Sequence, residues 1–296
     1  MSTSLTVLRT GTVVVDEALP YHRATDRPLA WTHAGRSRRH LIEAPVSCYL
    51  IENRHGLTLI DSGWHAGNRD RAWQVANLRQ QYPVNKAVLP DGEAIHEQLE
   101  ERGLRPQDLD LVLLSHLHCD HADGLRHLAG APRVLVSAPE LSAASRDRLR
   151  YLPHEWKGVD VGTFLWDTQV GPFGAGWDVF GDGDLVMVHV PGHAWGLCAT
   201  LVRGDVTTEG DDAERAGWVG GVDAPGREDP RAFHLLTSDV GYGRPSFDEG
   251  LRPGVVVDAG LAEHSLAWVR AVESDPRCLG LMANHDPEVR PGARVF

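Results

Sequence analysis

The most informative run in this chain is Leu111-Val112-Leu113-Leu114-Ser115-His116-Leu117-His118-Cys119-Asp120-His121. Its first four residues are all apolar, which is typical of a strand buried on both faces. Side chains two apart at a strand end point the same way, so His116 and His118 can share one metal ion. Asp120 and His121 follow on the next turn and can face a second ion. The run therefore predicts a sheet edge that carries a metal site.

Four metal-capable side chains within six residues are costly to bury without a metal. Imidazole and carboxylate ligands suit zinc, iron, manganese or cobalt, and the residues alone do not choose among these metals. Cys119 lies inside the run, but we expect its side chain to point away from the ligands. A purely structural role for the whole cluster is the alternative interpretation.

The chain has 296 residues, with 42% hydrophobic and 24% charged residues, values typical of a globular enzyme. No segment approaches the roughly 20 apolar residues that span a bilayer, and residues 1–15 lack the features of a secretion signal. The cysteines Cys48, Cys119, Cys198 and Cys278 are far apart, which favours reduced thiols and a cytoplasmic location. A net charge of −12 argues against nucleic acid or an anionic membrane as a partner.

Apolar runs and turn signals predict alternating strands and helices. The expected strands are Leu5–Leu8, Val13–Val15, Ser47–Ile51, Leu57–Ile60, Leu111–Leu114, Arg133–Ser137, Leu185–Val190, Ala199–Val202, His234–Thr237 and Leu279–Ala283. The expected helices are Asp91–Arg102, with Asp91 as the cap, about Pro139–Leu149, and a late helix through Ala262 and Val272. Residues 16–44 are expected to form a long loop. We expect one α/β domain over residues 1–296, interrupted by an acidic insertion or lid at about 204–230.

Three later strand ends offer further ligands. His193 follows a strand and a Pro-Gly turn, Asp239 ends another strand, and His285 follows the last one. Each is a metal-capable residue placed directly after an apolar run. Strand ends of this kind are where open sheets present catalytic groups.

With these residues in place, the chain resembles the metallo-β-lactamase superfamily, whose fold is an αββα sandwich of two packed mixed sheets with helices on the outer faces. The superfamily carries its ligands in the order His-x-His-x-Asp-His, then His, Asp and His. The resemblance implies that a first metal is held by His116, His118 and His193. It implies that Asp120, His121 and His285 hold a second metal, with Asp239 bridging both.

The resemblance extends to Leu57–Gly63, a strand-and-turn motif whose Asp61 orients a ligand histidine. The alternative is that Asp61 only caps a turn. Two divalent ions are expected as cofactors, with zinc first and iron, manganese or cobalt as alternatives.

Within the superfamily, the chain is similar to the N-acyl-homoserine lactonases. Tyr242 lies three residues after Asp239, where a tyrosine in that family contacts the lactone carbonyl, and 44–51, 115–121 and 284–288 also match. The alternative for Tyr242 is loop packing. Two features depart from the family: Trp195 stands in the turn after His193, and the acidic insertion is longer. Both are expected at the substrate entrance.

These observations predict a metal-dependent hydrolase that opens a small lactone or ester. The first candidate substrate is an N-acyl-homoserine lactone, whose hydrolysis would make the protein a quorum-quenching enzyme. A hydroxide bridging two metals would attack the carbonyl. Tyr242 would donate to the developing oxyanion, and Asp239 would relay a proton to the leaving alkoxide. Asp120, Asp239 and Tyr242 are thus the expected catalytic residues. A homodimer is a possible assembly.

Two other functions stay open. One is a different hydrolase on the same fold, a thioesterase or a phosphodiester or phosphotriester hydrolase. The other is a metal-dependent redox or binding protein, which predicts redox-active iron and no hydrolysis.

Overall fold

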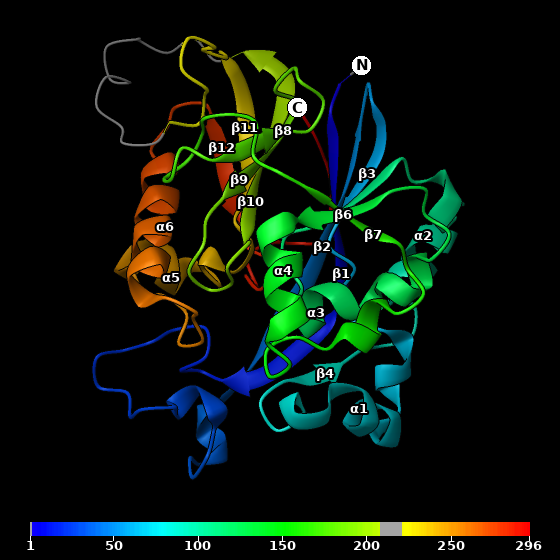
Figure 1. Cartoon of the computed structure of the whole chain (residues 1–296), viewed down its shortest axis with the longest axis vertical. Helices are drawn as coiled ribbons and strands as arrows, with labels where there is room; N and C mark the ends of the chain where they lie inside the picture. The colour runs from blue at the N-terminus through cyan, green and yellow to red at the C-terminus, as the bar shows by residue number, and fades with distance from the viewer. Residues whose placement is uncertain (1, 208–220) are drawn as a thin grey trace.

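Two sheets packed face to face form the centre of the molecule, and the computed structural model describes residues 2–207 and 221–296 (Figure 1). The first sheet has the order β13 (Gly292–Val295), β1 (Ser4–Asp16), β2 (Leu41–Asn53), β3 (Gly56–Ile60), β5 (Leu111–Leu114), β6 (Val134–Ser137) and β7 (Val161–Phe164), with β4 (Lys86–Val88) also paired to β1. The second sheet has the order β12 (Cys278–Met282), β11 (Arg231–Leu236), β10 (Cys198–Thr207), β9 (Leu185–His189) and β8 (Gly176–Asp178). Both sheets contain parallel and antiparallel pairs.

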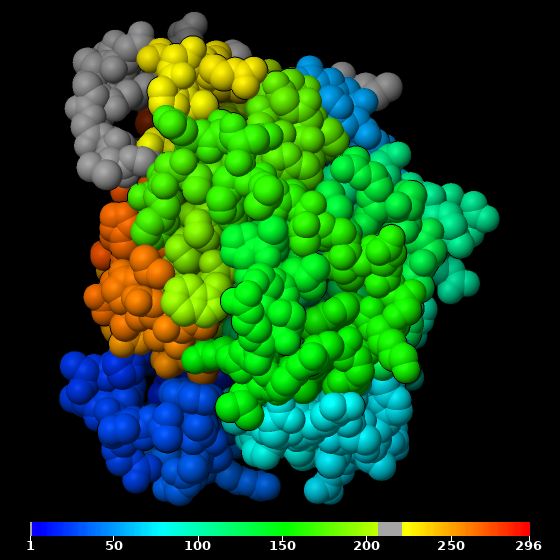
Figure 2. All heavy atoms as spheres, in the orientation of Figure 1, coloured from blue at the N-terminus to red at the C-terminus, as the bar shows by residue number. Residues whose placement is uncertain are grey.

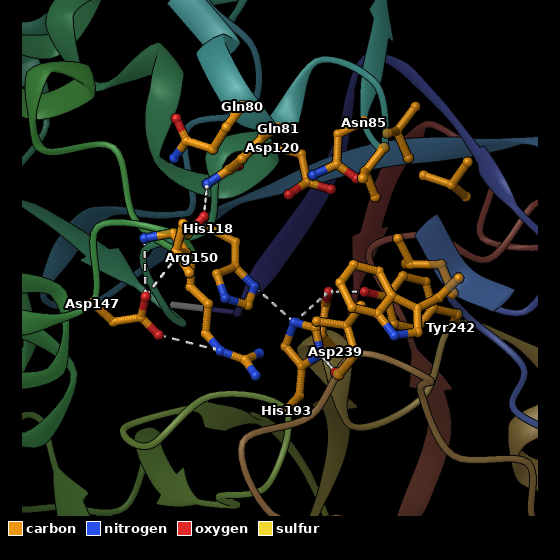
Figure 3. A pocket seen from close by; sticks show the side chains of 17 residues that line it. Gln80, Gln81, Asn85, His118, Asp120, Asp147, Arg150, His193, Asp239 and Tyr242 are labelled. Atoms are coloured by element: carbon orange, nitrogen blue, oxygen red, sulfur yellow. Dashed lines mark hydrogen bonds and ion pairs between the residues drawn. The ribbon is translucent and has the colours of Figure 1, made fainter. Parts of the chain in front are cut away.

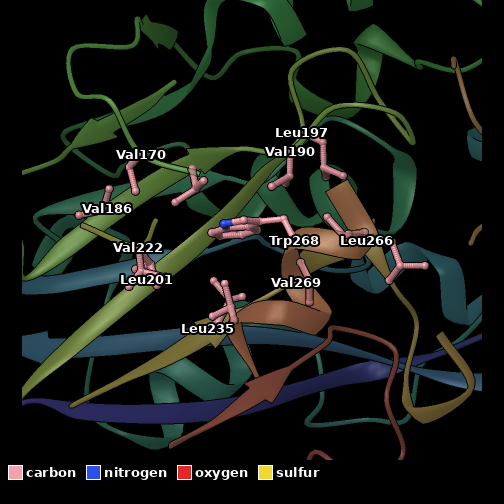
Figure 4. Packing of buried hydrophobic residues seen from close by; sticks show 14 of the residues in the cluster. Val170, Val186, Val190, Leu197, Leu201, Val222, Leu235, Leu266, Trp268 and Val269 are labelled. Carbon is pink, nitrogen blue, oxygen red and sulfur yellow. The ribbon is translucent and has the colours of Figure 1, made fainter. Parts of the chain in front are cut away.

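Helices cover the outer face of each sheet (Figure 1). The helices α1 (Arg71–Leu78), α2 (Ile95–Glu101), α3 (Cys119–Ala122) and α4 (Ala138–Arg146) lie on the side of the first sheet. The helices α5 (Arg244–Glu249) and α6 (Ala259–Val272) lie on the side of the second sheet. Figure 4 shows Leu266, Trp268 and Val269 of α6 packed on strand residues such as Leu201 and Leu235. The expected αββα sandwich is confirmed.

Strand β5 is buried on both faces of the first sheet, which is why all four of its residues are apolar. Leu111 and Leu113 pack in the layer between the two sheets, while Val112 and Leu114 pack under the helices of the first sheet. The strand lies between β3 and β6 and pairs in parallel with both. Because successive side chains alternate between faces, burial on both sides requires every position to be apolar.

Several expected boundaries were wrong. Leu5–Leu8 and Val13–Val15 belong to one strand, β1, which shifts register near Gly11 (φ +77°), where a Cβ would lie 2.3 Å from the Val88 carbonyl oxygen. Helix α2 begins at Ile95 rather than at Asp91, because the Glu97 carboxylate accepts the Ala94 N–H (3.0 Å) in place of an Asp91 cap.

Helix α4 ends at Arg146 rather than at Leu149. The Asp147 carboxylate accepts the backbone N–H groups of Leu149 (3.0 Å) and Arg150 (3.1 Å), which competes with helical hydrogen bonding. The chain therefore turns away from the helix axis at this point.

The loop expected over residues 16–44 is shorter, because β2 already begins at Leu41. The remainder contains short 3-10 turns and is held by buried Asp16, whose Oδ2 lies 2.7 Å from His33 Nδ1 and accepts from Arg36 Nε at 2.8 Å. Because this loop is tied to the end of β1, it stays beside the first sheet.

The start of the insertion expected at about 204–230 overlaps β10, which continues to Thr207. Gly204 belongs to this strand, and a Cβ there would lie 2.4 Å from the Phe296 ring. Residues 208–220, the centre of the expected lid, lie outside the described residues. Within the described ranges, no helix combines the length and apolar character needed to cross a membrane.

Candidate metal centre

Four separate strand ends bring the predicted ligands to one place between the sheets. His116 and His118 follow β5, His193 follows β9, Asp239 follows β11 and His285 follows β12. Figure 3 shows His118, His193 and Asp239 directed toward a common centre at the bottom of a pocket. The structure thus brings the predicted residues together across more than half of the chain.

One group of potential ligands contains His116, His118 and His193. His118 Nδ1 lies 3.1 Å from His116 Nε2 and 2.8 Å from His193 Nε2. His118 therefore presents Nδ1 to the centre, whereas the other two present Nε2. Three imidazole nitrogens converging on one point match the histidine set that holds a catalytic zinc.

A second group contains Asp120, His121 and His285. His285 Nε2 lies 3.5 Å from Asp120 Oδ2, and His121 Nε2 lies 3.1 Å from Asp239 Oδ1. Asp239 stands between the two groups. Its Oδ1 also lies 3.3 Å from His285 Nε2, while its Oδ2 lies 3.4 Å from His193 Nε2. This placement suits a carboxylate that contacts two cations at once.

The donor set fits metal ions. His121 Nε2, His285 Nε2 and Asp239 Oδ1 are buried and have no hydrogen-bond partner among the residues that the structure describes, which is costly unless another group satisfies them. Burial lowers the pKa of His116, His118 and His193, so these rings stay neutral, the form that binds metals.

The negative charge of the buried Asp239 carboxylate favours positive charge on the groups beside it. Burial opposes the charged form of His121, but the Asp239 and Asp61 carboxylates outweigh it and raise the pKa of this ring well above its usual value. Burial likewise opposes the charge on His285, and Asp239 raises its pKa. Without metal, protons on these two rings supply the positive charge that cations would supply.

A second layer of hydrogen bonds orients the ligand rings. His121 Nδ1 lies 2.8 Å from Asp61 Oδ2, which confirms the contact predicted for Asp61. The outer nitrogens of His193 and His285 each lie close to a backbone carbonyl oxygen, of Val255 (2.8 Å) and Pro45 (2.7 Å). Such contacts fix the ring orientation and leave the inner nitrogen free for a ligand.

The pocket above the centre has a volume of about 570 Å³. Besides the residues of the centre, three segments form most of its wall: apolar residues of β1 and the following loop, the turn that follows α1, and the chain that follows α4; Val255, before α6, adds to it. The lining side chains include Val13, Val15, Leu19, Trp31, Gln80, Gln81, Val84, Asn85, Asp147, Leu149, Arg150 and Val255. In Figure 2 these segments, coloured blue, cyan and green, pack side by side at the lower end of the molecule.

Tyr242 joins the pocket to the centre. Its side chain is 4% exposed and lines the pocket, and its hydroxyl donates to Asp239 Oδ2 at 2.5 Å. Burial raises the pKa of Tyr242 well above its usual value, and the negative charge of Asp239 adds to the effect. The phenol therefore keeps its proton at neutral pH and can act as a hydrogen-bond donor.

The expected entrance residues were partly wrong. Trp195 is 47% exposed and is not among the residues that line the pocket. Most of the described residues 222–230 of the expected lid line a different depression, together with Asp178 of β8, Val186 of β9 and Arg203 of β10. Cys119 also lies outside the centre, as predicted, and its Sγ accepts from Asn85 Nδ2 at 3.6 Å.

Arg150 and Asp147 were missed by the sequence reasoning. Asp147 lies in the segment that was assigned to a helix, Arg150 directly follows that segment, and neither belongs to a motif. The break of α4 at Arg146 is what brings them into the pocket. The Asp147 turn, with a carboxylate two and three residues before the N–H groups it accepts, was the only local signal.

A further group of metal-capable residues, His55, Asp182 and Asp184, lies far from the pocket. Its carboxylates already pair with cations, because Arg54 contacts both aspartates at 2.8 Å and Arg231 contacts Asp184. The described contacts therefore account for this group as an ion-pair cluster.

The sequence is similar to a known protein family and to several named relatives. A family model described as the metallo-beta-lactamase superfamily matches residues 41–212. An N-acyl homoserine lactonase of Bacillus cereus is 25% identical over 261 residues, which cover 87% of each chain. The N-acyl homoserine lactonase AttM of Rhizobium johnstonii is 26% identical over 83% of each chain.

Solved structures share the fold. One is an N-acyl homoserine lactone hydrolase with the product N-hexanoyl-L-homoserine bound at its catalytic metal centre (TM-score 0.70, 19% identity, 96% of this chain and 94% of that one). Another is AidC, a dizinc quorum-quenching lactonase (TM-score 0.61, 12% identity, 99% and 94% of the chains). Because the family model spans more than half of the sequence and the two sheets have the matching architecture, the chain belongs to the metallo-beta-lactamase superfamily and is a hydrolase.

Proposed function

We propose that this protein opens the ring of an N-acyl-homoserine lactone at a two-metal centre. The observation that carries the proposal is Tyr242, a protonated donor that lines the pocket and lies 2.5 Å from the carboxylate between the two ligand groups. The names of the relatives support the choice of substrate, since the Bacillus cereus and Rhizobium johnstonii proteins are both called N-acyl homoserine lactonases.

The ligand roles follow the two groups described above. His116, His118 and His193 would hold one ion, and Asp120, His121 and His285 the other, with Asp239 touching both. Zinc is the metal we propose first, and iron, manganese and cobalt accept the same ligands. When bound, two divalent cations lower the pKa of a water between them and polarise the substrate carbonyl.

The chain's own residues then position and stabilise the reacting groups. Tyr242 would donate a hydrogen bond to the carbonyl oxygen as negative charge develops on it, exchanging its contact with Asp239 for one with the substrate. Asp239 lies within reach of the same space and would pass a proton to the departing alkoxide. The apolar wall formed by Val13, Val15 and Trp31 would accept the acyl chain and exclude water.

The test compares Tyr242→Phe with the wild type, both loaded with zinc and with metal content measured. We expect the variant to retain its metal and to lose roughly a hundredfold in kcat on an N-acyl-homoserine lactone, the usual effect of removing an oxyanion donor. Tyr82→Phe is the matched control, because Tyr82 is partly buried and lies outside this pocket.

Two results would overturn the proposal. One is wild-type turnover by Tyr242→Phe. The other is a metal-loaded wild type that leaves lactones intact while hydrolysing thioesters or organophosphates, which would assign a different hydrolase activity to the centre. A His118→Ala variant that kept both metals would contradict the ligand assignment.

A further inference from the structure

A cationic side chain in the pocket has no part in the reaction proposed above. Arg150 lines the pocket together with His118 and His193. In Figure 3 Arg150 and Tyr242 lie on opposite sides of these two histidines, so a molecule bound at the centre would be flanked by both. Arg150 is also the only lysine or arginine among the residues that line the pocket.

The guanidinium of Arg150 is held in position. Its Nε lies 3.3 Å from Asp147 Oδ2, and its Nη2 donates to the Val256 carbonyl oxygen at 3.0 Å. Asp147 itself is fixed, because its Oδ1 accepts the backbone N–H groups of Leu149 and Arg150. A side chain restrained in this way loses little further entropy when it binds a ligand.

These contacts leave one donor group unused. They occupy Nε and Nη2, and no acceptor in the described part of the chain contacts Nη1. Asp147 already balances the positive charge locally. A neutral acceptor such as a carbonyl oxygen therefore suits Nη1 better than a second carboxylate does.

We propose that Arg150 Nη1 donates a hydrogen bond to the acyl-amide oxygen of the substrate and so selects amide-bearing lactones over simple alkyl lactones. This inference rests on the proposed function, since it places the lactone ring at the same centre. In an N-acyl-homoserine lactone the amide nitrogen is attached to the carbon next to the scissile carbonyl. The amide oxygen is thus only a few bonds from the scissile carbonyl, so with that carbonyl beside Tyr242 the amide oxygen would face Arg150.

The experiment measures kcat/KM on two neutral lactones of similar size, N-hexanoyl-homoserine lactone and γ-decalactone, which has no amide. For Arg150→Met we expect a loss of about tenfold to a hundredfold on the amide lactone, mostly in KM, as for a lost hydrogen bond to a charged donor. On γ-decalactone we expect a change of no more than about twofold.

Arg148→Met is the matched control, because Arg148 is exposed on the same segment and does not line the pocket. It should leave both activities within about twofold of the wild type, as surface substitutions usually do. Arg150→Lys keeps a cationic donor and should retain more selectivity than Arg150→Met. Thermal unfolding of each variant identifies any that fail to fold, and Arg150→Lys then carries the comparison.

Equal losses on both lactones would overturn the inference, because they would indicate a general structural role for Arg150. An unchanged ratio of the two kcat/KM values in Arg150→Met would do the same, and so would a ratio in Arg150→Lys that falls below that of Arg150→Met. Failure of the proposed function looks different: the metal-loaded wild type would open neither lactone, and the selectivity assigned to Arg150 would fall with it.

Discussion

Replacing Asp61 by asparagine is expected to lower both the free energy of unfolding and the metal affinity, without straining the backbone. Asp61 is buried at the turn after β3 with a φ of +63°. Asparagine adopts this left-handed conformation more readily than most residues, so the substitution changes hydrogen bonding and charge alone.

The magnitude follows from the four hydrogen bonds that the carboxylate accepts. Oδ1 accepts the Ser115 N–H (2.8 Å), and Oδ2 accepts from Ser115 Oγ (2.8 Å), His121 Nδ1 (2.8 Å) and Asn284 Nδ2 (3.0 Å). An asparagine must turn its NH₂ toward one of these sets, and the smaller loss faces it to the Ser115 N–H. Two facing donors without an acceptor, the Ser115 N–H and the asparagine NH₂, and three weakened bonds together cost about 2–4 kcal/mol.

Metal affinity should fall as well, because His121 loses the carboxylate that orients its ring. Removing such a partner typically lowers metal affinity tenfold to a hundredfold. Urea unfolding of the metal-free protein measures the first effect, and competition with a chelator measures the second.

Asp91→Asn is the control for both assays, because its side chain is 98% exposed. It should change the free energy of unfolding by no more than about 0.5 kcal/mol. If Asp61→Asn matched the wild type in unfolding and in zinc affinity, the role given to the Asp61 carboxylate would be wrong.

Three further predictions concern pH, packing and metal removal. Burial lowers the pKa of His65 to about 4 and of His127 to about 3, so stability should fall as pH drops from about 6.5 toward 4, where only the unfolded chain takes up these protons. Urea unfolding at pH 7 and pH 5 should show this loss, and His127→Gln should reduce it. Gly124→Ala should destabilise by about 2 kcal/mol, because its Cβ would lie 2.1 Å from the Ser62 carbonyl oxygen, whereas Gly260→Ala, near the start of α6, should be neutral or stabilising in the same assay. Chelation should lower the melting temperature, and added zinc at a hundred times its Kd should restore about 2.7 kcal/mol; a melting temperature insensitive to zinc would contradict the metal centre.

Much of the fold was readable from local patterns. The apolar run of β5 predicted burial on both faces, and the structure shows its side chains alternating between two apolar layers. The strands Ser47–Ile51 and Leu57–Ile60 were predicted from two apolar runs, and both are present, as parts of β2 and β3, which pair with each other. These predictions held because each depends on residues that are neighbours in the chain.

Boundaries failed where a side chain competed with the backbone. The Asp147 carboxylate ends α4 early, and the Glu97 carboxylate starts α2 late. Periodicity alone does not reveal which polar side chain captures a free N–H group, because that depends on how the chain turns beyond the helix.

The residues of the candidate metal centre could likewise be identified from the sequence. His116, His118, Asp120 and His121 stand close together in sequence, and each of the later candidates directly follows an apolar strand. The resemblance to the metallo-β-lactamase superfamily implied how these residues group, and their places at strand ends agree with it, because open sheets present such groups at the ends of their strands.

Contacts between segments that are distant in the sequence could be identified only from the tertiary structure. Packing of the two sheets against each other brings Pro45 to His285 and Asp61 to Asn284, contacts that orient the centre across more than 200 residues. Most of the pocket wall is formed by three segments that share no sequence motif, and only the packing of the chain places Arg150 opposite Tyr242. Ligand identity depends on local chemistry, whereas ring orientation and pocket shape depend on how the two sheets and their connecting loops pack.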